Sequence, residues 1–386
     1  MTAVDSTTSP STAEAWRQHL DAEMARTGQW PERSPWIRPA VAALPRDRFA
    51  PARLWDWDGH AWQPVDRDTD PARWLEHLFG HPSRPAVTEL AGNLPSSSLS
   101  APAVVVDMLD SLLPEPGHRV LELGTGTAWN AALLAHRAGP GLVTSIEVDP
   151  RLAAAGASRL RAAGLDVHVR AGDGTAGLPA GAPYDRVIAT YAVERIPWPW
   201  IEQSAPGGRL VVPWGRLGHV ALTVAEDRGS ATGWLQGLAR FMPDRTGATA
   251  GGPERGFTEI RRSAPPGPER RTERDPAELR DWDLLFHLRV VLPEVRVETA
   301  ADADGVSAWI HDGASSWATL SSTPDGVFVH QGGPRRLAEE VGAARDEWAG
   351  LGRPEVYDYG MTVTPDAQWA WFGDPATGPR WPTPAA

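Results

Sequence analysis

The residues best suited to chemistry lie in three short segments near the middle of the chain. They are Val120-Leu-Glu-Leu-Gly-Thr-Gly-Thr127, Glu147 and Gly172-Asp-Gly174. In the first, an apolar run leads into a glycine turn, where backbone can approach a ligand closely. Glu147 ends a later run that is expected to be a strand, and Gly172-Asp-Gly174 follows the next one. Because the carboxyl ends of parallel strands meet at one edge of a sheet, these segments predict a nucleotide pocket.

The acids decide which nucleotide fits, since nucleotide dehydrogenases share such a glycine turn. Glu122, two residues before the first glycine, suits a positively charged sulfonium and amino group rather than a pyrophosphate. Glu147 can accept both ribose hydroxyls, and Asp173 can meet the adenine amino group. Each residue alone is also compatible with a turn or strand cap, but in register they predict S-adenosylmethionine. The expected cofactor-binding residues are Glu122, Gly124, Thr125, Gly126, Thr127, Glu147, Asp173 and Gly174.

The elements that must position these residues alternate between residue 101 and about residue 215, as in a doubly wound sheet. Helices are expected at 101–113, 127–138, 150–163 and 198–204. Strands are expected at 118–123, 142–148, 167–171, 185–190 and 208–214. Residues 15–50 read as helical, whereas residues 51–80 lack a clean period and are expected to be irregular.

The pattern changes after residue 215. A strand at 219–225 is expected to extend the sheet, and residues 243–275, dense in Pro, Gly, Arg and Glu, predict a linker or long loop. A second unit follows, with helices at 276–291 and 334–349 and short strands near 295–299, 306–310, 316–321, 327–330 and 360–364.

The predicted fold class is α/β, with a Rossmann-like methyltransferase sheet, an N-terminal helical cap and a smaller α+β C-terminal domain. The expected organisation is a disordered lead-in at 1–14, the methyltransferase domain at 15–242, the linker, an auxiliary domain at 276–375 and a tail at 376–386.

Composition narrows the function classes. The 386 residues are 41% hydrophobic and 22% charged, which is typical of a soluble globular protein. No apolar run approaches the ~18 residues of a membrane span, and the N-terminus lacks a secretory pattern, so a cytoplasmic protein is expected. The absence of cysteine and the scattered histidines predict no metal site. A net charge of -12 argues against a nucleic-acid partner.

Between about residues 40 and 215 the chain resembles the protein-L-isoaspartate O-methyltransferase family. The matching segments are Pro45-Arg-Asp-Arg-Phe49, Leu99-Ser-Ala-Pro102, Val120 to Thr127, Ser145-Ile-Glu147, Gly172-Asp-Gly174, Pro183-Tyr-Asp185, Ile196-Pro197 and Gly207-Gly-Arg-Leu-Val-Val-Pro213. The resemblance implies a Rossmann-like sheet, S-adenosylmethionine as cofactor, and methylation of an aspartyl or isoaspartyl carboxylate in a peptide.

The resemblance also implies site residues. Ser100 matches the family's active-site serine, and Ser98 stands at its hydroxyl position two residues earlier, so both are expected to be catalytic; Ser96-Ser-Ser98 could equally be a flexible turn. The expected substrate-binding residues are Leu99, Ser100, Ala101 and Thr190. Three departures stand out: Ala128 replaces a common glycine, Trp129 replaces a common tyrosine, and Thr190-Tyr-Ala-Val193 replaces a run of small residues.

The length of the chain suggests a particular branch. Repair enzymes of the family usually end soon after the Gly-Gly-Arg-Leu strand, whereas about 170 residues follow it here. This long form resembles an actinobacterial branch found with ribosomally made, modified peptides such as lanthipeptides, graspetides and lasso peptides. Its members methylate an aspartate in a constrained peptide, and the ester closes to an aspartimide.

We therefore expect a peptide-maturation methyltransferase. Repair of isoaspartyl proteins is the alternative within the same chemistry; a non-catalytic peptide-binding protein and a dehydrogenase are alternatives from other classes. The C-terminal domain is expected to recognise the peptide, mediate dimerisation or cap the active site.

Overall fold

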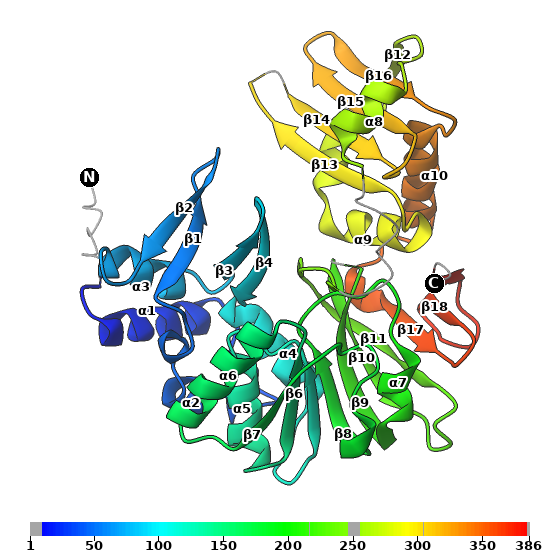
Figure 1. The fold of residues 1–386 in the computed structure, drawn as a ribbon. Helices are drawn as coiled ribbons and strands as arrows, with labels where there is room; N and C mark the ends of the chain where they lie inside the picture. The colour runs from blue at the N-terminus through cyan, green and yellow to red at the C-terminus, as the bar shows by residue number, and fades with distance from the viewer. Residues whose placement is uncertain (1–9, 216, 246–254, 304, 384–386) are drawn as a thin grey trace. The chain divides into compact units, whose positions relative to one another are not determined.

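The computed structural model describes residues 10–383 except 216, 246–254 and 304. The chain forms two compact units (Figure 1). Unit 1 comprises Met1–Tyr191 and Pro199–Val212, and unit 2 comprises Ala192–Trp198 and Pro213–Ala386. None of the described helices has the length and apolar character that crossing a membrane requires.

The central sheet of unit 1 is parallel. Its strand order is β7 (Val167–Ala171), β6 (Val143–Glu147), β5 (Val120–Leu123), β8 (Tyr184–Ala189) and β9 (Ser204–Trp214). The strands alternate along the chain with α4 (Pro102–Leu112), α5 (Trp129–Ala138), α6 (Pro150–Ala162) and the short α7 (Trp198–Glu202). All four residues of β5 are buried, as expected for a parallel strand covered on both faces. The predicted doubly wound α/β sheet is confirmed.

The N-terminal part of unit 1 combines helices with a second sheet. Helices α1 (Ala13–Arg26) and α2 (Ile37–Ala43) precede a 3-10 turn at Arg46–Arg48. An antiparallel sheet follows in the order β2 (Trp62–Asp66), β1 (Arg53–Trp57), β3 (Ala86–Ala91) and β4 (Leu94–Leu99), and α3 (Pro71–Phe79) lies between β2 and β3 in sequence (Figure 1). The helical cap is therefore only part of this region.

The expectation of irregular structure at 51–80 is wrong, for a physical reason. In β1 the outward positions that follow the inward Leu54 are Trp55 and Trp57 rather than polar residues, so the apolar-polar alternation of a strand is absent from the sequence. The start of α3 was readable, however. Asp70 accepts a hydrogen bond from the Arg73 amide, and Pro71 occupies the first helical turn.

Unit 2 contains two antiparallel strand sets. One has the order β10 (Gly218–Val224), β11 (Ala231–Leu238), β17 (Tyr359–Val363), β18 (Gln368–Phe372) and β19 (Arg380–Pro382). The other has the order β12 (Arg270–Thr272), β16 (Gly326–Gly332), β15 (Trp317–Thr323), β14 (Val306–His311) and β13 (Arg296–Ala301). Helices α9 (Trp282–Val291) and α10 (Leu337–Gly350) share an apolar core with this second sheet.

The unit boundaries differ from the expected ones. Unit 2 takes in residues from 192 onward, whereas the auxiliary domain was expected to begin at residue 276, after a linker at 243–275. The described part of segment 243–275 holds α8 (Phe257–Ser263) and β12, and residues 246–254 lie outside the described residues. β12 reads Arg-Arg-Thr, and β19, in the expected tail, reads Arg-Trp-Pro. Neither sequence has the apolar-polar alternation that predicts a strand. At the other end, α1 begins at Ala13, within the expected lead-in, and residues 1–9 lie outside the described residues.

Candidate functional site

The glycine turn after β5 lies against two side chains that follow β8. Gly124 has a φ of +98°, and a Cβ there would lie 2.3 Å from the hydroxyl oxygen of Thr190 and 3.0 Å from the ring of Tyr191. The Thr190 hydroxyl donates to the carbonyl of Gly124 at 2.6 Å. Glycine at 124 is thus required by both conformation and space. Thr190, predicted to bind substrate, here fixes the turn.

Tyr191 extends this arrangement to the third predicted segment. A Cβ on Gly174 would lie 2.9 Å from the Tyr191 hydroxyl oxygen and 3.1 Å from Leu123. The Gly174 carbonyl accepts a hydrogen bond from the indole of Trp200 at 2.9 Å. The ring of Tyr191 therefore packs against both glycine segments. The sequence showed Tyr191 only as part of a departure from the family pattern. The glycines at 124 and 174 were the signal that a bulky side chain packs closely against both segments.

Glu122 lies behind the turn, fully buried. One carboxylate oxygen accepts from the Asn130 amide at 2.8 Å and the other from the Ser145 hydroxyl at 2.5 Å. Ser145 is also hydrogen-bonded to the Thr125 hydroxyl at 2.6 Å. Burial, the main cause, raises the pKa of Glu122 to about 7. In this arrangement Glu122 braces Thr125 from within, and both its oxygens already have protein donors.

Glu147 and Asp173 occupy the ends of the neighbouring strands, as predicted. Glu147 closes β6 and accepts the Gly126 amide at 2.8 Å, so it holds the second glycine of the turn. Asp173, after β7, is exposed and accepts the Thr175 amide at 2.8 Å. The two predicted acids thus lie at the same edge of the parallel sheet as the glycine turn.

Helix α5 starts immediately after the turn in an unusual conformation. Its N-cap residue, Ala128, has a φ of +73°, in the left-handed region that favours glycine. Thr127, just before it, is buried. Gly156 of α6 makes the close packing here possible, because a Cβ on it would lie 2.9 Å from the Thr125 methyl group and 3.3 Å from the Ala128 Cβ. Replacement of the family's glycine by Ala128 therefore leaves a left-handed residue at the turn.

The serine segment forms the opposite wall of the site. Ser98 is in β4, Ser100 follows the strand, and both side chains are half-buried, whereas Leu99 and Ala101 are buried. A Cβ on Gly126 would have the Ser98 carbonyl oxygen as its nearest neighbour, at 4.0 Å. The structure therefore brings the serine segment to the glycine turn. Ser96-Ser-Ser98 is part of a strand and not a flexible turn.

Arg46 anchors this segment from beneath. Its guanidinium, 1% exposed, donates to the carbonyls of Leu78, Leu99 (3.1 Å) and Ser100 (2.8 Å). It also stacks 5.5 Å from the ring of Trp129, the first residue of α5. Burial lowers its pKa to about 9, so it is charged at neutral pH. The family resemblance included the segment Pro45-Arg-Asp-Arg-Phe49 but assigned no role to Arg46.

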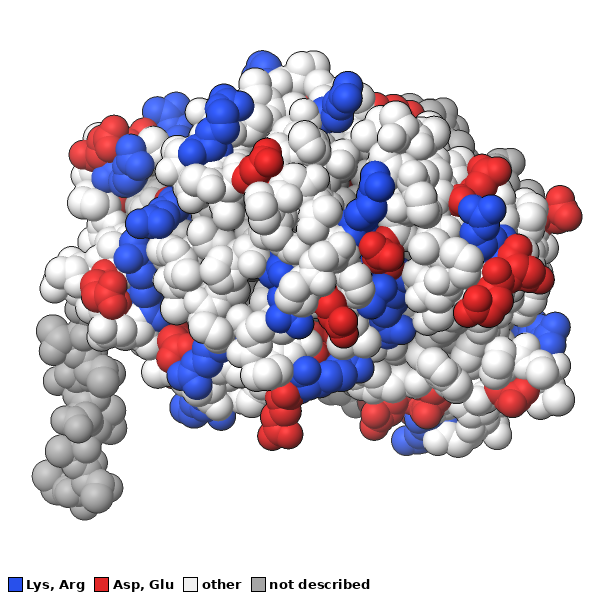
Figure 2. Space-filling view, turned by 90° about the horizontal axis from the view of Figure 1, so that it is seen from below, with Lys and Arg blue, Asp and Glu red and all other residues white. Residues whose placement is uncertain are grey.

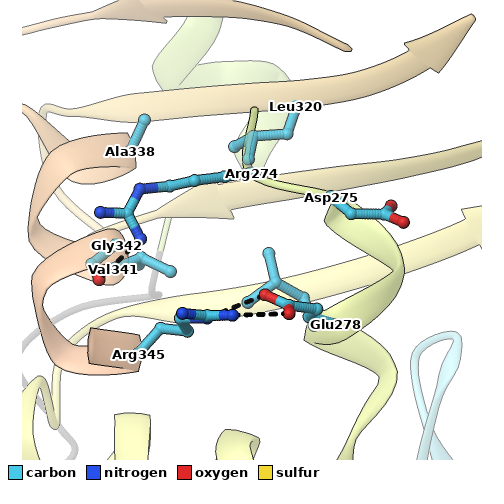
Figure 3. A pocket seen from close by; sticks show the side chains of 9 residues that line it. Arg274, Asp275, Glu278, Leu320, Ala338, Val341, Gly342 and Arg345 are labelled. Carbon is cyan, nitrogen blue, oxygen red and sulfur yellow. Dashed lines mark hydrogen bonds and ion pairs between the residues drawn. The ribbon is translucent and has the colours of Figure 1, made fainter. Parts of the chain in front are cut away.

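Other surfaces offer less. Figure 2 shows basic and acidic side chains interspersed over the face that it draws, without a continuous patch of one sign. A hollow in unit 2 is lined by two arginines, but each is paired with a carboxylate. Figure 3 shows Arg345 with Glu278, at 2.7 Å. Arg274 pairs with Asp346 at 2.8 Å. Their charge is therefore balanced within the protein. Within the described part of the chain, no group of three acidic or histidine side chains is placed to hold a metal ion.

Comparison with known proteins agrees with this geometry. The family model described as "Protein-L-isoaspartate(D-aspartate) O-methyltransferase (PCMT)" matches residues 75–243. Protein-L-isoaspartate O-methyltransferase 1 of Anaeromyxobacter sp. (strain Fw109-5) is 36% identical over 221 residues, which cover 55% of this chain and 89% of that protein. The corresponding protein of Aeropyrum pernix is 40% identical over 161 residues, 40% of this chain and 62% of that protein. The chain thus spans less than two thirds of the latter relative's length.

One solved structure matches nearly the whole fold. A protein-L-isoaspartate O-methyltransferase superposes with a TM-score of 0.52 at 18% identity, covering 93% of this chain and 100% of that one. This likeness is one of fold, and it confirms the predicted fold class. The match also extends over most of unit 2, so the solved methyltransferase has a counterpart to most of that unit.

Proposed function

Because the chain belongs to the protein-L-isoaspartate O-methyltransferase family, we propose that it transfers a methyl group from S-adenosylmethionine to the free carboxylate of an isoaspartyl residue in a peptide. The observation that carries this proposal is that the glycine turn and the serine segment lie next to each other. The glycine turn, held by Glu147 and Thr190, adjoins the serine segment, which is held by Arg46.

The residues present fit the cofactor. A Cβ on Gly126 would meet only the Ser98 carbonyl at 4.0 Å, and one on Gly172 would meet no atom within 4 Å, so backbone is open to a ligand at both places. Gly126, Glu147 and Asp173 would hold the cofactor, while Glu122 supports the turn from behind. When bound, the cofactor supplies an electrophilic methyl group on a cationic sulfur.

The chain's own residues need little proton chemistry. A carboxylate has an ordinary pKa near 4 and is ionised at neutral pH, so it attacks the methyl carbon without a general base. The Ser100 hydroxyl can donate a hydrogen bond to one carboxylate oxygen and leave the other free to react. The site must mainly align the reacting atoms and exclude water. Arg46 contributes a positive charge behind Ser100 that favours an anionic substrate.

The test is methyl transfer to a linear isoaspartyl peptide, with the matched aspartyl peptide as control and the mass gain of one methyl group as readout. In Ser100→Ala, kcat should fall roughly 10- to 100-fold, the effect of losing one hydrogen bond to a charged group. The dissociation constant of the cofactor should not change. Ser96→Ala, in the same serine run, should retain wild-type kcat. An unchanged kcat in Ser100→Ala would remove Ser100 from the mechanism, and failure to bind cofactor in calorimetry would favour a non-catalytic binding protein.

A second candidate is the narrower reading in which the substrate is a ribosomally made, modified peptide whose ester closes to an aspartimide. Its support is the sequence resemblance to the long actinobacterial form. Chain length no longer adds to it, because the fold match of the solved methyltransferase also covers most of unit 2. The comparisons favour the isoaspartyl substrate. Methylation of a macrocyclic precursor peptide, with the linear isoaspartyl peptide left unchanged, would reverse that order.

A further inference from the structure

The four-stranded sheet of unit 1 carries a row of side chains that ends at the serine segment. Cross-strand partners in the antiparallel register are Trp55 with Pro64, Trp55 with Val87, and Val87 with Ser98. Directly opposite residues of antiparallel strands point to the same face. Pro64, Trp55, Val87 and Ser98 therefore form one row across β2, β1, β3 and β4.

The two faces of this sheet differ sharply. The opposite face carries Leu54, Val65, Ala86 and Leu99, each at most 1% exposed, so it belongs to the core. The face with the row is more open along β1 and β2, although it also carries the Arg53–Asp66 ion pair and Val87 of β3 is only 9% exposed. Trp57 lies there, paired with Trp62, and remains 45% exposed.

The open face is also held in place. The rings of Trp57 and Trp62 lie 5.4 Å apart, and the Trp62 indole donates to the Asn93 carbonyl at 3.2 Å, which links the β1–β2 hairpin to the β3–β4 hairpin. Next to Asn93, Leu94 is 72% exposed. Large apolar side chains held rigidly in solvent are characteristic of binding surfaces.

We propose that this face, consisting of Trp55, Trp57, Trp62 and Pro64, docks an apolar side chain of the peptide substrate near the residue that is methylated. The inference rests on the proposed function. Its occupant follows from continuity, because the row leads directly to Ser98, beside the glycine turn. β1 and β2 precede residues 75–243, which the family model matches.

The register sets the distance. Trp55 lies two strands from Ser98, which corresponds to about 10 Å at the usual spacing between strands. An extended peptide rises about 3.3 Å per residue, so about three residues separate the reacting carboxylate from the side chain that meets Trp55. A peptide with phenylalanine three residues from the isoaspartate should therefore bind better than one with serine there. This preference should hold on one side of the isoaspartate only, the side on which the peptide runs along the row.

The experiment compares steady-state kinetics of isoaspartyl peptides carrying phenylalanine or serine three residues before or after the isoaspartate. The enzymes are the wild type, Trp55→Thr/Trp57→Thr, which keeps residues suited to strands, and Trp282→Thr, which removes a 43% exposed tryptophan in unit 2. The double variant should raise KM about tenfold for one phenylalanine peptide, with kcat and cofactor affinity unchanged. The serine peptides and Trp282→Thr should show no change.

Three results would overturn the docking proposal: an unchanged KM in the double variant, equal losses for phenylalanine and serine peptides, or the same loss in Trp282→Thr. If the double variant does not fold, Trp57→Thr alone and the wild-type preference between peptides decide the matter. Loss of a homodimer in Trp57→Thr, without a change in peptide preference, would assign the face to a second copy of the chain. If the wild type methylates no isoaspartyl peptide, the proposed function fails. Fluorescence anisotropy of labelled peptides then tests docking directly, and equal binding by all variants refutes it.

Discussion

Replacing Arg46 by methionine should separate the charge beneath Ser100 from the structure that it supports. Methionine has a similar length and is apolar, so it removes the guanidinium with little loss of volume. The three carbonyls that Arg46 now serves, those of Leu78, Leu99 and Ser100, would lose their donor. The positive charge behind the serine segment would also disappear.

The effect on stability is the difference of two terms. Three hydrogen bonds from a charged donor contribute about 7 kcal/mol at roughly 1.5–3 kcal/mol each. Burying the charge costs about 5 kcal/mol, since burial lowers the pKa from 12.5 to about 9. Arg46→Met should therefore lower the free energy of unfolding by only about 2 kcal/mol, as measured by urea denaturation. Arg48→Met, an exposed neighbour, should change it by less than about 0.5 kcal/mol.

Arg46→Met should also weaken substrate binding, which is measured as an increase in KM. A carboxylate bound by the Ser100 hydroxyl would lie about 8 Å from the guanidinium, where two opposite charges attract by about 2 kcal/mol at an effective dielectric constant of about 20. Loss of that attraction raises KM for the isoaspartyl peptide by up to about 30-fold. The dissociation constant of the cofactor serves as the internal control and should stay close to the wild-type value.

Arg46→Lys distinguishes charge from geometry. Lysine keeps the charge but cannot reproduce the planar fork that reaches three carbonyls and stacks on Trp129. It should lose stability like the methionine variant, yet retain a KM near that of the wild type. Equal increases in KM for lysine and methionine would show that the charge does not act on the substrate. An unchanged KM in both would refute the reasoning altogether.

Two further changes test the glycine turn. Burial raises the pKa of Glu122 from 4.5 to about 7, so the contribution of Glu122 to the free energy of unfolding falls by about 3 kcal/mol as pH rises through this window. In Glu122→Gln that fall should be absent. Denaturation curves of the wild type and the variant that change equally between pH 4.5 and 8 would contradict this. Ala128→Gly should stabilise the protein by about 0.5 kcal/mol, because glycine adopts the left-handed conformation of residue 128 without strain. The control Ala132→Gly, inside the same helix, should destabilise the protein by about 1 kcal/mol or more. Melting temperatures of the two variants that shift in the same direction would show that Ala128 is not strained.

The parts of the fold that could be read from sequence share one property. The parallel strands and their helices alternate regularly along the chain and many of them are bounded by glycine or proline, which fixes where each begins and ends. β7 was predicted at its observed bounds of 167–171. The missed strands lack that contrast. β4 reads Leu-Pro-Ser-Ser-Ser-Leu, and its pairing with β3 depends on contacts across the sheet rather than on its own composition.

The site shows the same limit at the level of single residues. Residue identity predicted which side chains lie at the ends of the strands: Glu147 closes β6, and Asp173 comes shortly after β7. It did not predict where their partners lie. Glu122 has the expected position at the end of β5, but Asn130 and Ser145 take up both its oxygens. Such pairings involve segments 8 and 23 residues away, and local spacing cannot specify them.

Selectivity in a reaction of this kind has to arise away from the reacting atoms. Aspartyl, glutamyl and isoaspartyl carboxylates are all ionised at neutral pH, and a difference of one methylene is worth only about 1–3 kcal/mol in a pocket. One hydroxyl at Ser100 would therefore accept each of them. An isoaspartyl residue differs most in the path of its backbone, which is displaced by the extra methylene. A rigid surface that fixes a neighbouring side chain about 10 Å away converts that displacement into misalignment of the carboxylate. We therefore expect Trp55→Thr/Trp57→Thr to reduce the ratio of kcat/KM for isoaspartyl over aspartyl peptides, and an unchanged ratio would place selectivity at the serine segment instead.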